Sequence, residues 1–129
     1  MESKTHELSM MGEVFLNDIM RGIKKYEGRI YSHKCKQMRS GDILKFYENS
    51  CGWGIVCKII NLHPFPSFKN MCSTLGVLTL LPQLEPLSHT LSQESLLEEA
   101  VKIYESFPGS ERVKQLGCVG IEVEFLSKY

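Results

Sequence analysis

The sequence predicts an α/β fold of the α+β type, in which a small mixed sheet curls into a barrel and two or three helices pack against it. Short β-forming runs are separated by glycine, proline and asparagine turns, whereas two other stretches repeat apolar residues at helical spacing. The hydrophobic and charged fractions, 43% and 23%, are those of an ordinary globular protein. Because 129 residues is a usual length for one domain, we expect residues 1–129 to form a single domain.

The first part of the chain is predicted to contain one helix between two strands. Residues 5–10 indicate a first strand with Leu8 pointing inward. A helix is predicted over 12–21, and Gly22 stands where a left-handed C-terminal cap belongs. The apolar face of this helix is predicted to comprise Val14, Phe15 and Ile19, flanked by Leu16, Met20 and Ile23. Residues 25–31 follow directly and predict a strand on which positions 25, 27 and 29 share one face.

The middle of the chain is predicted to form a hairpin followed by an ambiguous segment. Residues 43–47 and 53–61 are both rich in β-forming residues and are separated by a turn, which predicts an antiparallel hairpin. Because proline cannot donate to a β-ladder, we expect the prolines within 63–67 to end the second strand. Residues 68–81 fit a short helix, a loop, or a buried strand at 77–81. The sequence assigns no role to the 62–90 region.

The last part of the chain predicts a second helix and a closing strand. The helix spans 92–107, with Thr90 and Gln93 as a capping box. Its buried stripe is predicted to comprise Leu96, Leu97, Ala100, Val101 and Tyr104. Pro108-Gly109 ends the helix, and apolar residues alternate from 119 to 126 as in a strand with one face in the core.

The charge distribution is polarised although the net charge is zero. Residues 21–45 contain eight basic and two acidic side chains, a local balance of +6. Residues 85–112 contain six acidic and two basic side chains, a local balance of −4. The basic segment is a candidate footprint for a phosphate-rich partner, and the alternative is that each segment is a solvated face.

Several classes of protein are disfavoured. No apolar run approaches the length of a membrane helix, and the N-terminal residues lack the apolar core of a signal peptide, so we expect no membrane association. Five cysteines without a C-x-x-C pair predict free thiols, and with them an intracellular location in the cytoplasm or nucleus. His33, Cys35 and His63 fit no recognised zinc spacing, so neither a metal nor a cofactor is predicted.

A family resemblance covers nearly the whole chain. Residues 22–29 match the pattern G-x-K-x-x-E-x-R directly after the first predicted helix, and 41–46 resemble a G-D-x-I-x-F strand start. Residues 6–9, 103–104 and 117–123 resemble the opening strand, helix and closing strand of the same family. The chain therefore resembles a small, single-domain member of the ASCH family within the PUA-like superfamily. The resemblance implies a PUA-like barrel with a cleft beside the first helix and an RNA-associated function.

The matched motif supplies the candidate binding residues. Lys24 would place an ammonium near the mouth of the cleft, as a point charge for phosphate or, with a lowered pKa, as a base. Arg29 offers a bidentate fork to phosphate or to a base edge, and Glu27 accepts from an exocyclic amine or orients the two cations. Further candidates in the basic half are Lys25, Arg21, Lys34 and, for base stacking, Trp53. The alternative is an internal ion-pair network that holds the helix against the strand.

Three functions remain open at this point. The first is binding of RNA or a modified nucleotide or nucleobase in the basic cleft. The second is an enzyme on the same cleft with Lys24 and Glu27 as catalytic residues, either a ribonuclease or an acetylcytidine-type amidohydrolase. That amidohydrolase branch carries a threonine where this chain has Glu27, and no motif identifies its later glutamate within 85–94, so its reaction does not carry over directly. The third is a protein-interaction adaptor that uses the acidic second helix. The oligomeric state is not predicted.

Overall fold

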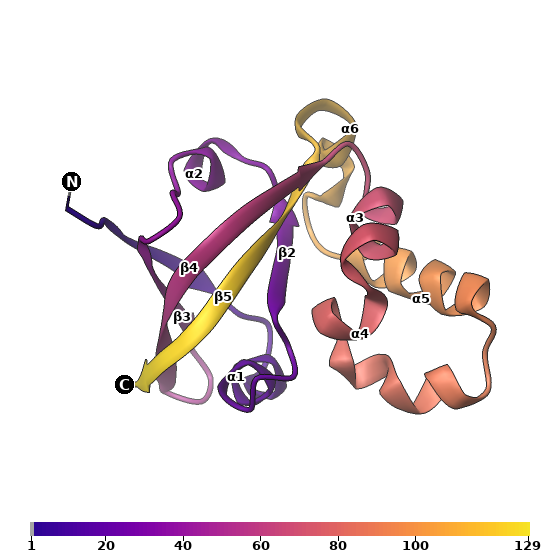
Figure 1. Ribbon diagram of the computed structural model, residues 1–129, viewed down its shortest axis with the longest axis horizontal. Helices are drawn as coiled ribbons and strands as arrows, with labels where there is room; N and C mark the ends of the chain where they lie inside the picture. Colours follow the sequence, from indigo (N-terminus) through magenta and orange to yellow (C-terminus); the bar gives the residue numbers. More distant parts are fainter. Residues whose placement is uncertain (1) are drawn as a thin grey trace.

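The computed structural model describes residues 2–129 and contains one curled, mixed five-stranded sheet (Figure 1). The strands are β1 (Thr5–Ser9), β2 (Tyr26–Ile30), β3 (Ile43–Glu48), β4 (Trp53–Phe65) and β5 (Cys118–Lys128). Their order across the sheet is β1-β3-β4-β5-β2, with β1 parallel to β3 and every other neighbouring pair antiparallel. The predicted α+β class with a barrel-like mixed sheet is therefore confirmed.

Helices account for more of the chain than the two or three that the sequence predicts. They are α1 (Glu13–Met20), α2 (His33–Lys36), α3 (Phe68–Leu75), α4 (Val77–Leu80), α5 (Gln93–Glu105) and α6 (Val113–Leu116), with the 3-10 helices η1 (Pro82–His89) and η2 (Ser110–Arg112). The two predicted helices correspond to α1 and α5. In Figure 1, α3, α4 and α5 gather on one side of the sheet, beyond β2. Within residues 2–129, no helix is both long enough and apolar enough to cross a membrane.

The ambiguous segment after β4 is helical, so the interpretation of a buried strand at 77–81 is wrong. The side chain of Ser67 accepts a hydrogen bond from the Asn70 backbone N–H at 3.1 Å and caps α3. Gly76 has a φ of +97°, a conformation that only glycine adopts readily, and it separates α3 from α4. The local capping residues thus divide this stretch into two short helices.

The prolines after the hairpin do not end β4 where the sequence predicts. The strand continues through Pro64, which is paired with Val119 of β5. The register of β3 with β4 reaches only as far as Lys58, so the last residues of β4 have β5 as their ladder partner. At this position one side of β4 has no neighbouring strand among the described residues to pair with. No N–H donor is needed on that side, so a proline is tolerated.

Two further predictions about helices need correction. In α1 the buried residues include Leu16 and Ile19, whereas Val14 is 59% exposed, because the helix packs on the sheet through its 16/19 face. Gly22 does adopt the predicted left-handed cap conformation, with φ of +76°. At α5 the capping residue is Ser92, whose side chain accepts from the Ser95 N–H at 3.1 Å, in place of the predicted box starting at Thr90.

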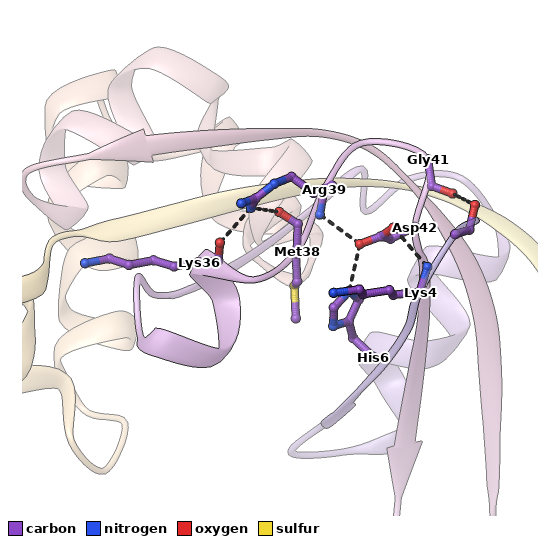
Figure 2. A network of polar contacts seen from close by, with 8 residues as sticks. Lys4, His6, Lys36, Met38, Arg39, Gly41 and Asp42 are labelled. Carbon is purple, nitrogen blue, oxygen red and sulfur yellow. Dashed lines mark hydrogen bonds and ion pairs between the residues drawn. The ribbon is translucent and has the colours of Figure 1, made fainter. Parts of the chain in front are cut away.

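A polar network fixes the start of β3 against β1. Figure 2 shows Asp42 accepting hydrogen bonds from the backbone N–H of Lys4 at 3.1 Å and of Arg39 at 3.0 Å, with His6 Nε2 at 2.8 Å from the carboxylate. These bonds, His6 foremost, hold the pKa of Asp42 below its usual value. The network sets the parallel register that carries the end of β1 to the candidate site.

Two hydrophobic cores lie side by side. One lies between the sheet and α1 and includes Leu16, Phe46 and Val119. The other lies within the helical lobe, a name used here for α3, α4, η1 and α5, and includes Met71 and Tyr104. The cores adjoin along β2 and β5, where consecutive residues Cys118 and Val119 belong to different cores.

Candidate functional site

A cavity of about 360 Å³ lies between the sheet and the helical lobe. On one side it is lined by the end of β1, by α1, β2 and the start of α2. The other side is formed by α3, α5 and the turn that leads into η2. A cavity of this size, with an apolar lining and a few polar groups, is typical of a small-molecule or single-residue binding site.

Three charged side chains converge on this cavity. Glu27 lies between the two cations, with its Oε1 at 3.3 Å from Lys24 Nζ and its Oε2 at 2.7 Å from Arg29 Nε. Glu27 and Arg29 point to the same side because they are two residues apart in β2. All three side chains line the cavity, so the arrangement supplies a carboxylate held by two cations at the surface of one pocket.

Lys24 lies at the back of the cavity, in contrast to the predicted position near its mouth. The residue is only 2% exposed, because α4 covers it and the Leu80 carbonyl accepts a hydrogen bond from its ammonium. The Phe15 ring lies 5.5 Å from Nζ on another side. Burial lowers the pKa of Lys24, and the neighbouring Glu27 carboxylate offsets only part of this effect.

Glu27 remains ionised near neutral pH despite its burial. Burial by itself would raise the pKa of Glu27, but the Arg29 guanidinium and the Lys24 ammonium together outweigh it and lower that pKa. A carboxylate has about four lone-pair positions, and each oxygen contacts one cation here. Glu27 therefore keeps the capacity to accept hydrogen bonds from a bound molecule.

Arg29 connects the buried pair to solvent. Its side chain is 27% exposed, and its Nη2 donates to the Ser9 carbonyl and lies 3.4 Å from Met10 Sδ. The exposed residues Met11 and Arg112 also line the cavity, which places its opening on the same side. Arg29 is thus the member of the cluster that a ligand meets first.

The remaining candidates from the sequence lie outside the cavity. Arg21, Lys25 and Lys34 are exposed, and none of them lines the pocket. Lys25 was expected to share a face with Glu27 and Arg29, but Lys24 takes that place because regular strand geometry begins only at Tyr26. Trp53 is half-buried at the β3–β4 hairpin, where Lys128 Nζ lies 4.3 Å from its ring.

Two residues of the cavity wall were not singled out as functional from the sequence. Tyr104 was assigned to the buried stripe of α5 and to the 103–104 segment of the family resemblance, and Gly28 to a variable position of the motif. A Cβ placed on Gly28 would lie 2.7 Å from Tyr104 Oη, so the glycine allows α5 to approach β2 closely. No local sequence signal marks this contact, because it depends on how α5 packs against β2.

The described part of the chain offers no preformed metal site. Within residues 2–129, no group of three or more His, Cys, Asp or Glu side chains is placed to hold a metal ion. The five cysteines carry free thiols, and Cys35 lines the cavity, where burial raises the pKa of its thiol.

The fold and its cavity place the chain among small α+β proteins in which a curled sheet and a helical lobe enclose a ligand-sized pocket. Hypothetical protein PH0355 is 31% identical, with a TM-score of 0.76 over 95% of this chain and 99% of that one. Protein PF0455 from Pyrococcus furiosus is 28% identical, with a TM-score of 0.71 over 95% and 98% of the two chains. The chain belongs to the same family as PH0355. No protein-family model and no curated protein matches the sequence.

Proposed function

We propose that this protein is an ASCH-type, PUA-like module that binds a nucleobase, presented by RNA or by a modified nucleotide, in the cavity beside α1. The observation that carries the proposal is the convergence of Lys24, Glu27 and Arg29 on a single cavity that opens at Arg29. These residues are the K, E and R of the motif on which the ASCH resemblance rests. The resemblance and the geometry thus point to the same residues.

The shape of the site favours one base over a stacked strand. A cavity of about 360 Å³ suits a single flat ring and part of its sugar. Proteins that recognise RNA bases commonly take unpaired, splayed-out nucleotides into such pockets. The rest of an RNA chain would remain outside, near Arg112 and the exposed lysines Lys34 and Lys36 of α2.

The charges of the site fit the polar groups of a nucleotide. Glu27 accepts hydrogen bonds and suits an N–H or amino group on a base edge. Arg29 is partly exposed beside it and suits a phosphate or carbonyl oxygen. The apolar walls supplied by Phe15, Leu81 and Phe107 would contact the faces of the ring.

Binding measurements on a matched pair of arginine variants test the proposal. We would titrate the wild type with ribonucleoside monophosphates and with short single-stranded and structured RNAs at low salt. Arg29→Ala is expected to weaken binding roughly tenfold or more, because a charge-assisted hydrogen bond contributes about 1.5–3 kcal/mol. Arg21→Ala, in the same basic segment but outside the cavity, is expected to bind within about twofold of the wild type. Equal losses in both variants, or no binding by the wild type, would contradict the proposal.

A second candidate, an enzyme on the same cavity, is favoured by one observation. Burial lowers the pKa of Lys24, which is the change that a lysine needs to act as a general base. Its amine would take a proton from a water or a ribose hydroxyl of the bound nucleotide. Incubating RNA and modified nucleosides with the wild type and with Lys24→Met tests this function. Product formation that is lost in Lys24→Met, while binding persists, supports an enzyme, and equal product from both proteins rejects it.

A further inference from the structure

Tyr104 is held rigidly in the wall of the cavity. The residue is 3% exposed, and its ring stacks on Phe68 with centroids 5.4 Å apart and an interplanar angle of 15°. Phe107 packs edge-on with the same ring at 6.0 Å and 87°. Because two aromatic neighbours and the surrounding core hold the ring, the position of the hydroxyl is set before any ligand arrives.

The hydroxyl of Tyr104 is left without a protein partner. Within residues 2–129, Tyr104 Oη is a buried side-chain atom with no hydrogen bond. A buried hydroxyl normally has a partner, because leaving it unpaired costs stability. The close approach of Tyr104 to β2 also depends on a glycine, since a Cβ on Gly28 would meet Oη at 2.7 Å. Because side chains alternate along β2, Gly28 faces away from Glu27 and Arg29, so the hydroxyl lies across the strand from the charged cluster, near enough for the Glu27 charge to raise the pKa of Tyr104.

We infer that Tyr104 is a ligand-binding residue whose hydroxyl donates a hydrogen bond to an acceptor on the ligand, while Glu27 accepts from an N–H on the same ligand. This inference rests on the proposed function and specifies which part of the ligand is recognised. Burial and, after it, the Glu27 charge raise the pKa of Tyr104 well above its ordinary value, so the hydroxyl keeps its proton and acts as a donor. Glu27 is ionised and acts as the acceptor.

A donor and an acceptor in the wall of one cavity define the polar groups that the ligand must carry. The matching ligand has a carbonyl or imino acceptor and an N–H or amino donor, and an unpaired nucleobase exposes both kinds of group on its Watson–Crick edge. The same edge is occupied in a base-paired duplex. The site should therefore bind unpaired bases and reject both a paired base and a base that is methylated at the donor nitrogen of this edge.

The test compares Tyr104→Phe, which removes only the hydroxyl, with the wild type. The ligands are the four ribonucleoside 5′-monophosphates together with N3-methyluridine monophosphate, titrated by calorimetry. For the nucleotide that binds best, Tyr104→Phe is expected to weaken the affinity roughly three- to tenfold, the range for one neutral hydrogen bond. Its thermal midpoint without ligand should equal or exceed that of the wild type, because an unpaired buried hydroxyl is removed. Tyr47→Phe, outside the cavity, is the matched control and should change neither quantity.

The outcomes separate this inference from the function on which it rests. Unchanged affinity in Tyr104→Phe would overturn the inference and leave the proposed function intact, and a lower thermal midpoint would then show that the hydroxyl only supports the fold. Equal binding of uridine and N3-methyluridine monophosphates by the wild type would likewise overturn it. If the wild type binds none of the nucleotides, the proposed function fails and the inference fails with it.

Discussion

Glu27 is the residue on which the two cations of the site depend. Its carboxylate is the counterion nearest to the buried Lys24 ammonium, and it also fixes the Arg29 side chain. Desolvating an ammonium is costly unless an opposite charge and hydrogen bonds compensate for it. The cluster is therefore sensitive to loss of its central member.

Replacing Glu27 with glutamine is expected to destabilise the protein. The amide keeps the shape of the side chain but leaves Lys24 buried without a counterion, and breaking a buried pair in this way costs roughly 3 kcal/mol. Urea unfolding near neutral pH measures the change in the free energy of unfolding. Glu99→Gln removes the partner of an exposed pair with Lys102 and should change stability by less than about 1 kcal/mol. Equal effects of the two substitutions would contradict this account of the cluster.

The lowered pKa of Glu27 predicts a specific dependence of stability on pH. Below its ordinary pKa of 4.5, Glu27 in the unfolded chain takes up a proton while the folded protein still holds the carboxylate. The unfolded state then binds more protons, so stability falls as the pH falls towards the folded-state pKa. The pKa of Asp42 is also lowered, so Asp42 adds to the fall in stability over a similar acidic pH range. We therefore expect a shallower acid slope in Glu27→Gln than in the wild type, measured by urea unfolding at successive pH values. If stability depended on pH with the same slope in both proteins, the pKa of Glu27 would not differ between the folded and unfolded states.

At the scale of elements, sequence patterns predicted the strands and the helices α1 and α5 but missed the four-residue helices. The α1 and α5 helices, the β3–β4 hairpin and β5 each span enough residues for a repeat to emerge from the sequence. The helices α2 and α4 have four residues each, too few to show one. The extension of β4 through Pro64 depends on where β3 stops pairing, which no local pattern reveals.

The candidate site was predictable only in part, for the same reason. The spacing of Glu27 and Arg29 in a strand was enough to place both on one side. The burial of Lys24 depends on the Leu80 carbonyl, which is 56 positions further along the chain. The role of Tyr104 in the cavity wall likewise depends on how α5 packs against β2. Such contacts come from tertiary packing and leave no local signal in a single sequence.

The packing of α5 on β2 makes a prediction about Gly28. An alanine there would place its Cβ 2.7 Å from Tyr104 Oη and 2.8 Å from Met71 Cε, so the two elements must separate. We expect Gly28→Ala to lower the free energy of unfolding by about 1–3 kcal/mol, the usual cost of overpacking, as measured by urea unfolding. Adding Tyr104→Phe should restore part of this loss, because one of the colliding atoms is removed. Strictly additive effects in this double-mutant cycle would contradict the contact.

At the scale of the whole molecule, the site lies where two unlike parts meet. The basic segment 21–45 belongs to the sheet side of the cavity, and the acidic residues of α5 belong to the helical lobe. The zero net charge of the chain argues against a broad electrostatic surface for RNA. Recognition is therefore expected to depend on the cavity, with neighbouring cations such as Arg112 adding a small, salt-dependent contribution.

The most direct test of this account is an NMR titration of the labelled protein with a short unpaired RNA, followed through the backbone amides. We predict that the largest chemical-shift changes occur at residues lining the cavity, including Gly28, Ser32 and Arg112. The indole N–H of Trp53, which lies outside the cavity, should remain unchanged. Shifts confined to the acidic face of α5, or to exposed lysines outside the cavity, would contradict the claim that the cavity is the binding site.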